Sequence, residues 1–125
     1  MARSSAEFEK KFKKNARIAG FLVEEPRPIV ADQAVEDRNG KIRKIKTLPD
    51  CFIIEPINRL SMHVEITNGS GNNNHKAAQQ RVVKAAGIKN YMMLTGNQVE
   101  EFCEKETPAD KRLFLLTIFG WLNLL

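Results

Sequence analysis

Cysteine and long apolar runs are scarce in this sequence of 125 residues, and each scarcity excludes a class of protein. The two cysteines, Cys51 and Cys103, are far apart in apolar surroundings, so we expect buried free thiols rather than a disulfide framework or a metal-binding pair. The N-terminus is charged from Arg3 onward, unlike a signal peptide. No apolar run approaches the length of a membrane span. These features predict a cytoplasmic protein with no membrane partner.

The glycine-rich fingerprints of nucleotide-binding proteins are also missing. No Walker spacing is present, and the polar segment 68–74 is too short and too late in the chain for a dinucleotide-binding loop. Its glycines are better explained by a turn. Its position just after Glu65 makes it a candidate loop on the substrate side of a site.

The overall composition is that of a globular domain. Hydrophobic residues make up 42% and charged residues 28% of the chain, which is ordinary for soluble proteins. The length suffices for one domain, 1–125, with a core of its own. Lys and Arg outnumber Asp and Glu by 20 to 15, a net charge of +5. This balance permits binding to a nucleic acid or another acidic surface without proving it.

Residues 48–67 organise the chain, because they read as two apolar strands joined by a turn. The run 51–54 is apolar throughout, Pro56 presets the turn, and 60–66 alternates between apolar and polar residues. Antiparallel pairing about this turn brings Asp50 and Glu65 to neighbouring ends of the hairpin. Two carboxylates placed together repel each other unless a cation lies between them. The hairpin therefore predicts a metal site.

A second explanation of these two acids competes with metal binding. Arg43, Lys44 and Lys46 lie just before Asp50 and are positioned to neutralise the pair through salt bridges.

For other polar residues near the hairpin, we expect an ordinary structural role first. His63 shares a strand face with Glu65 and is within reach of a metal or phosphate, but a partly exposed strand histidine is the commoner case. Glu55 lies in the turn and is expected to be solvated. His75 is placed to contact a phosphate at a helix start.

The first helix is predicted to begin near Ala6, after a cap at Ser4 or Ser5, and to end at Gly20. Its apolar stripe consists of Phe8, Phe12, Ala16 and either Ile18 or Ala19. Its remaining surface carries lysines that form either a solvated face or a strip that holds phosphates. The lysines concerned are Lys10, Lys13 and Lys14.

The rest of the chain predicts strands at 21–25 and 88–94, a hairpin of 33–36 with 42–47, and three more helices. The helices are 75–86 with Asn74 as N-cap, 98–106, and a last helix that begins at Thr107 and Pro108. The last helix is apolar almost all round, so it must be buried in the domain or against a second copy or another protein, through residues 109–125.

This order of elements resembles the PD-(D/E)xK nuclease superfamily, and within it the Holliday-junction resolvase-like and phage or virus-type nucleases. Pro49-Asp50 looks like the family's Pro-Asp element, and Glu65-Ile66-Thr67 looks like its (D/E)-x-K element. The resemblance covers residues 6–94, with 98–125 as a C-terminal extension. It implies an α/β (α+β) fold in which helices flank a mixed central sheet, with a restriction-endonuclease-like core.

The resemblance also implies a set of site residues. Asp50, Glu65 and the Ile66 carbonyl would hold Mg²⁺ or Mn²⁺, and Glu9 looks like the first-helix glutamate of the resolvase branch. Gln79 and Gln80 match the family's glutamine-bearing helix, with Gln80 expected to orient substrate or water. Thr67 departs from the pattern because it stands where the family has a lysine and cannot supply a cation. The candidate for a migrated lysine is Lys76.

The implied function is a metal-dependent DNA endonuclease or resolvase acting on the DNA backbone. The basic residues that would track the phosphates are Lys10, Lys13, Lys14, Arg43, Lys44 and Lys46. The threonine at position 67 favours an alternative, a catalytically inactive nuclease fold that binds DNA or a protein in a phage or replication-type assembly. A third possibility is an inhibitor that mimics or binds a nuclease.

Overall fold

The computed structural model describes residues 5–67 and 73–125. The helices are α1 (Ser5–Ile18), α2 (Asn73–Ala85), α3 (Gly96–Cys103) and α4 (Pro108–Ile118), followed by a short 3-10 helix, η1 (Leu122–Leu124). The strands are β1 (Leu22–Glu24), β2 (Ile29–Val30), β3 (Val35–Glu36), β4 (Ile42–Arg43), β5 (Lys46–Thr47), β6 (Cys51–Glu55), β7 (Leu60–Thr67) and β8 (Tyr91–Thr95).

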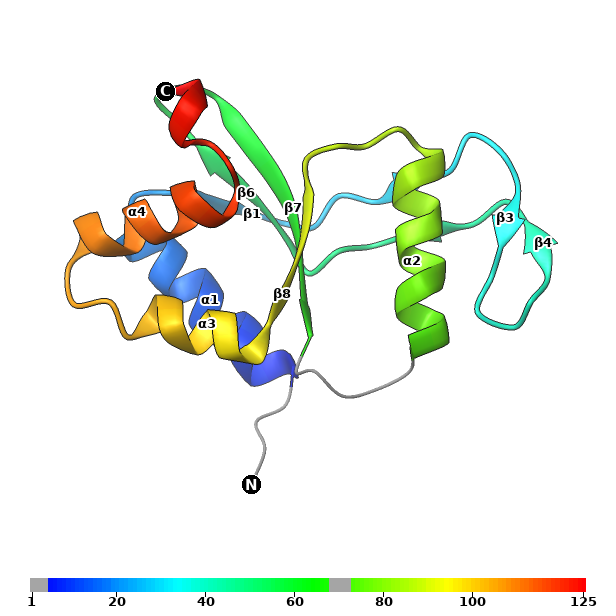
Figure 1. The fold of residues 1–125 in the computed structure, drawn as a ribbon, viewed down its shortest axis with the longest axis horizontal. Helices are drawn as coiled ribbons and strands as arrows, with labels where there is room; N and C mark the ends of the chain where they lie inside the picture. Colours follow the sequence, from blue (N-terminus) through cyan, green and yellow to red (C-terminus); the bar gives the residue numbers. More distant parts are fainter. Residues whose placement is uncertain (1–4, 68–72) are drawn as a thin grey trace.

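The centre of the molecule is a mixed sheet with strand order β1-β6-β7-β8 (Figure 1). The pairs β1–β6 and β6–β7 are antiparallel, whereas β7–β8 is parallel. The parallel pair requires a long crossover, and α2 lies within it. The predicted α+β class with a mixed central sheet is confirmed.

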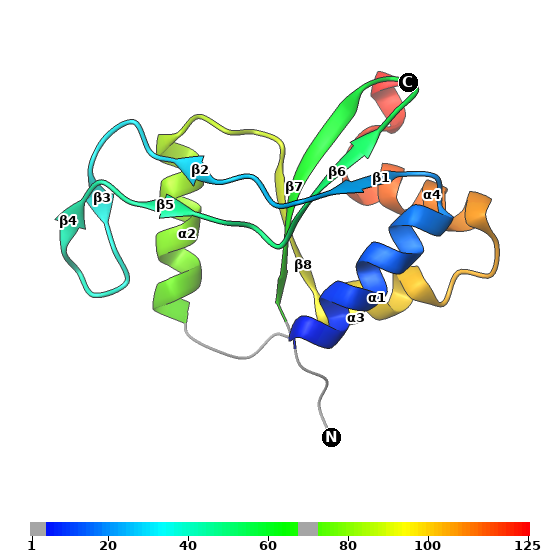
Figure 2. The ribbon, with the colours of Figure 1, turned by 180° about the vertical axis from the view of Figure 1, so that it is seen from behind.

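Three helices pack together against one side of this sheet. Figures 1 and 2 show α1, α3 and α4 grouped at one end of the molecule, away from α2. Phe12, Phe102 and Leu115, one from each of these helices, are fully buried together with Val64 of β7. This apolar cluster is the main core and holds β6 and β7 rigidly against the helices.

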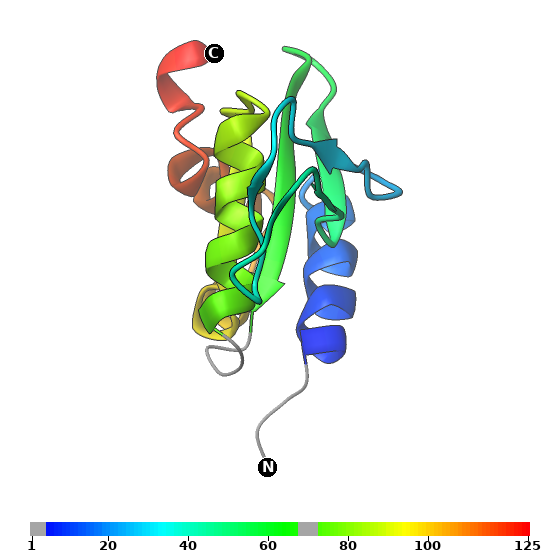
Figure 3. The same cartoon turned by 90° about the vertical axis from the view of Figure 1, so that its right-hand side faces the viewer.

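The opposite side of the sheet carries α2 and an arm built from β2, β3, β4 and β5. Figures 1 and 2 show the strands of the sheet between α2 and the other three helices, and Figure 3 views the molecule from the end that carries α2 and the arm. A smaller apolar cluster joins the arm to the helix through Ile29, Ala31, Val82 and Val83. The short strands pair as β2–β5 and β3–β4, both antiparallel.

Most predicted elements are present, with shifts at their ends. The stripe of α1 is buried with Ala19 rather than Ile18, which is 44% exposed. The segment 42–47 is not one strand, because β4 pairs with β3 and β5 turns away to pair with β2. Helix α2 already begins at Asn73, so Asn74 is inside the helix and is not its N-cap.

The last helix is shorter than predicted and only half buried. It is capped as expected, since Thr107 Oγ1 accepts from Asp110 N–H at 3.1 Å, but it ends at Ile118. Leu115 and Leu116 contribute to the core, whereas Leu113 is 54% exposed. No helix within 5–67 and 73–125 is long and apolar enough to cross a membrane.

Candidate active site

The β6–β7 hairpin brings Asp50 and Glu65 together, as the sequence predicts. Its antiparallel register pairs Cys51 with Val64, so Asp50, one residue before Cys51, stands opposite Glu65. The main-chain N–H of Ile66 donates to Asp50 Oδ2 at 2.6 Å. This bond fixes the Asp50 carboxylate at the end of the sheet.

The two carboxyl groups are close enough to affect each other's ionisation. Burial, followed by contact with Asp50 and the nearby charge of Glu9, raises the pKa of Glu65 to about 8. At neutral pH the apoprotein therefore relieves the repulsion by keeping a proton on Glu65. A divalent cation relieves the same repulsion without the proton.

Helix α2 contributes a polar contact to the pair. Gln79 Nε2 donates to Glu65 Oε2 at 3.4 Å, and this contact lowers the Glu65 pKa against the larger effect of burial. Gln80, which the resemblance favours, is exposed on α2. The glutamine beside the acid pair is thus Gln79.

Helix α1 brings Glu9 within electrostatic reach of the pair. The charge of Glu9 acts on both Glu65 and Cys51. Lys13 Nζ donates to Glu9 Oε1 at 2.8 Å, so Lys13 is held one turn along the same helix. The other two lysines predicted to contact DNA, Lys10 and Lys14, are exposed.

The salt-bridge explanation of the acid pair is wrong for Arg43, whose Nε lies 2.7 Å from Asp37 Oδ2. Among the residues that the structure describes, no ion pair joins Asp50 or Glu65 to a lysine or arginine. The raised pKa of Glu65 agrees with this, because a paired cation would lower it.

The remaining residues of the predicted motif lie at the ends of their elements. Thr67 is the last residue of β7 and is buried, and Lys76 is half-buried in the first turn of α2. The role of Lys76 stays a prediction. The loop 68–72 and the side chain of His75 lie outside the described part of the chain.

The exposure of His63 differs from the expectation, since its side chain is buried rather than partly exposed. Its ring lies 4.7 Å from the Phe52 ring, and burial lowers its pKa. His63 pairs with Tyr91 across β7 and β8. In the described chain, His63 Nδ1 and the Tyr91 hydroxyl are buried without a hydrogen-bond partner.

Glu55 was expected to be solvated, and this is wrong. Its side chain is fully buried and accepts from the main-chain N–H groups of Ile57 and Asn58 at 3.2 and 2.7 Å. Arg112 of α4 approaches it at 3.3 Å. Although burial raises the Glu55 pKa, these hydrogen bonds bring it below its usual range. Glu55 therefore closes the hairpin turn and is not part of the site.

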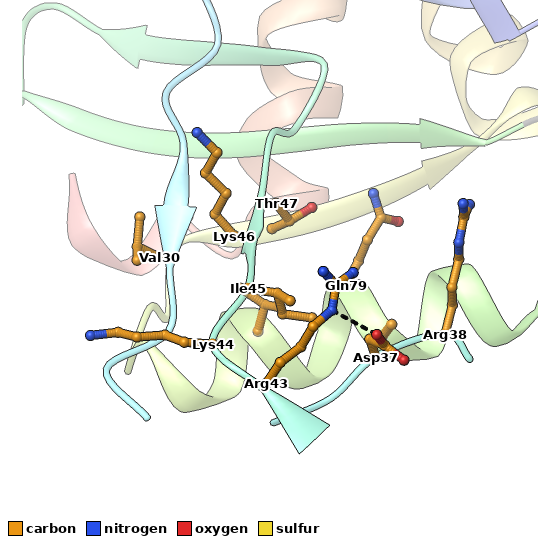
Figure 4. A pocket seen from close by; sticks show the side chains of 11 residues that line it. Val30, Asp37, Arg38, Arg43, Lys44, Ile45, Lys46, Thr47 and Gln79 are labelled. Atoms are coloured by element: carbon orange, nitrogen blue, oxygen red, sulfur yellow. Dashed lines mark hydrogen bonds and ion pairs between the residues drawn. The ribbon is translucent and has the colours of Figure 1, made fainter. Parts of the chain in front are cut away.

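Sequence reasoning missed a cavity of about 640 Å³ between α2 and the arm (Figure 4). The basic residues along it include three of the predicted DNA contacts, Arg43, Lys44 and Lys46, together with Arg38. The Asn-Gly turn beside Arg38 predicts only the local hairpin, and the cavity depends on how that hairpin docks on α2.

The residues present fit a magnesium ion. The site offers the carboxylate oxygens of Asp50 and Glu65 and the neighbouring Ile66 carbonyl, all hard oxygen donors. In phosphoryl-transfer sites Mg²⁺ commonly uses one or two carboxylates and keeps its remaining positions for water and phosphate. Over the described ranges, no group of three or more His, Cys, Asp or Glu is placed to hold a metal ion.

Comparison with protein-family models, with curated proteins and with solved structures finds no match for this chain. Its function must therefore be inferred from its own residues.

Proposed function

We propose that the protein is a Mg²⁺- or Mn²⁺-dependent endonuclease or resolvase-like phosphodiesterase that hydrolyses the DNA backbone. The observation that carries this proposal is the contact between the carboxyl groups of Asp50 and Glu65, which no described basic side chain neutralises. A bound metal ion would polarise the phosphate and lower the pKa of a water ligand.

Each residue of the site has a distinct task under this proposal. Asp50, oriented by the Ile66 N–H, and Glu65, oriented by Gln79, provide the metal ligands, with the Ile66 carbonyl as a further oxygen. Glu9 adds negative charge beside them, and its ion pair with Lys13 keeps a cation at the margin of the site. The basic residues of α1 and of the arm attract the phosphates.

Cleavage assays on branched and linear DNA test the proposal. We expect the wild-type protein to cut with Mg²⁺ or Mn²⁺, and Asp50→Asn and Glu65→Gln each to lose more than about 100-fold in rate, since both are assigned as ligands. Asp32→Asn is a control, because Asp32 is an exposed acid of the arm. Activity that survives both substitutions would contradict the assignment.

A second candidate function is a nuclease-like fold without catalysis that binds DNA or a protein partner. Two observations favour it: Thr67 replaces the expected lysine, and apolar side chains are exposed at the C-terminus, with Leu124 62% and Leu125 52% exposed. It predicts no cleavage of any substrate and DNA binding that Asp50→Ala leaves unchanged. Light scattering on the wild type and on Leu124→Ser tests whether this end forms a homo-oligomer.

A further inference from the structure

The cavity between α2 and the arm combines an apolar floor with a cationic rim. Val30, Ile45, Ala78 and Val82 supply aliphatic surface, and Ala78 and Val82 are buried beneath it. Its volume, about 640 Å³, is within the range of small-molecule sites, about 300–1,000 Å³. A cavity of this kind suits a ligand with an apolar plane and an anionic group.

The rim carries more positive than negative charge. Asp37, the one acid among the described residues that line the cavity, already accepts hydrogen bonds from the Asn39 and Lys41 N–H groups and from Arg43. Within the described part of the chain, no ion pair occupies Arg38, Lys44 or Lys46. The cavity therefore favours an anion.

The cavity adjoins the acid pair directly. Gln79 lines the cavity and donates to Glu65, and Thr47, also in the lining, precedes Asp50 by only three residues. In Figure 4 the side chains of Arg38, Lys46 and Gln79 extend toward the same side, whereas Lys44 points away from them. Arg38 and Lys46 are thus the cations best placed for a ligand that also approaches Glu65.

We propose that this cavity binds one unstacked nucleotide of a single-stranded DNA segment, with its base on the aliphatic floor and its phosphate at Arg38 and Lys46. The inference rests on the proposed function, because it places this nucleotide beside the phosphate that Asp50 and Glu65 would act on. A duplex is too wide to enter the cavity, so recognition requires an end, a branch point or a single-stranded stretch.

Binding of fluorescein-labelled oligothymidylate, measured by anisotropy in EDTA, tests the charged rim. We expect Arg38→Ala and Lys46→Ala each to weaken binding several-fold and to flatten the salt dependence, since each removes a phosphate contact. Lys84→Ala is the matched control, because Lys84 is exposed on α2 outside the cavity lining. Equal losses in all three variants would overturn the proposed site.

A strand of the same length without bases tests the apolar floor. We expect the wild type to bind this abasic strand at least about fivefold more weakly than oligothymidylate, because base contacts contribute strongly to single-strand binding. Ala78→Leu fills the floor and should abolish the difference. Val30→Glu, at a half-exposed position of the apolar floor, should do the same without altering the core. Equal affinity of the wild type for both strands would overturn the proposal.

These measurements separate the two proposals because they require no cleavage. If the wild type binds oligothymidylate more tightly than the abasic strand and Val30→Glu abolishes this difference, the nucleotide site in the cavity is supported even if the protein cuts no DNA. Conversely, if DNA is cut and Asp50→Asn abolishes cutting while Arg38→Ala and Lys46→Ala bind like Lys84→Ala, the site is not in this cavity and the nuclease proposal still stands.

Discussion

The ionisation of Glu65 depends on its burial and on its acidic neighbours. It is partly buried, it faces Asp50 across the hairpin, and its pKa is raised to about 8 from an ordinary value of 4.5. A proton and a metal ion compete for the same oxygen atoms. Consequently, metal affinity should rise steeply with pH over this interval.

The raised pKa predicts how the stability of the apoprotein depends on pH. The folded state holds the Glu65 proton more tightly than the unfolded state, so the stabilisation is complete below about pH 4.5 and is lost as the pH rises through about 8. We expect the melting temperature in EDTA to fall over this interval, and to fall less in Glu65→Gln. Thermal melts across pH, with Asp32→Asn as the control, measure this. An identical slope in Glu65→Gln would contradict the assignment.

Glu55 is a residue with a structural task. Because it accepts two main-chain hydrogen bonds and meets Arg112 in a buried place, Glu55→Ala should cost about 2 kcal/mol in the free energy of unfolding. Glu24→Ala removes an exposed ion pair with Arg27 and should cost less than about 0.5 kcal/mol. Urea unfolding of both variants compares them, and similar losses would mean that the turn does not need Glu55.

At the scale of the elements, local patterns predicted the hairpin and the capped start of α4 well, but not the end of α4 at Ile118. Period-two alternation over 60–66 and the turn at Pro56 fix the register, which is why the meeting of Asp50 and Glu65 was predictable. The contact of Gln79 with Glu65 was not predictable from these local patterns. Which of two adjacent glutamines faces the sheet depends on how α2 docks, and this docking involves Ile29 and Ala31 far away in sequence.

The two glutamines offer a matched comparison on one helix. Gln79→Ala removes a contact that lowers the Glu65 pKa, so the acidic limb of the pH profile for cleavage should move to higher pH and the rate at pH 7 should fall by about tenfold. Gln80→Ala should leave both unchanged, because Gln80 is exposed. Equal profiles for the two variants would remove Gln79 from the site.

The contact between α1 and α3 depends on a glycine. A Cβ at Gly96 would lie 2.7 Å from the Phe8 ring, so Gly96→Ala should destabilise the fold by about 1–3 kcal/mol. Asn97→Ala, at the exposed next position, should have little effect. Denaturant midpoints of the two variants measure the difference. A midpoint for Gly96→Ala equal to the wild type would mean that the ring moves aside at no cost.

For the whole molecule, basic side chains lie on both sides of the sheet. Lys10 and Lys14 are exposed on α1, and Arg38 and Lys46 line the cavity on the opposite side of the sheet. Composition predicted the net positive charge. It did not predict where the basic side chains lie, because the cavity forms only when the arm meets α2 in the tertiary structure. Figures 1 and 2 show the sheet between α1 and the arm. DNA that reaches Glu65 would therefore meet basic side chains on either side.

Anomalous scattering from crystals soaked in Mn²⁺ tests whether Asp50 and Glu65 bind a metal ion together. We expect a manganese peak within bonding distance of both Asp50 and Glu65 carboxylates in the wild type, and its loss in Glu65→Gln. Well-ordered carboxylates with no peak between them at saturating Mn²⁺, or a peak only at other residues, would contradict the account.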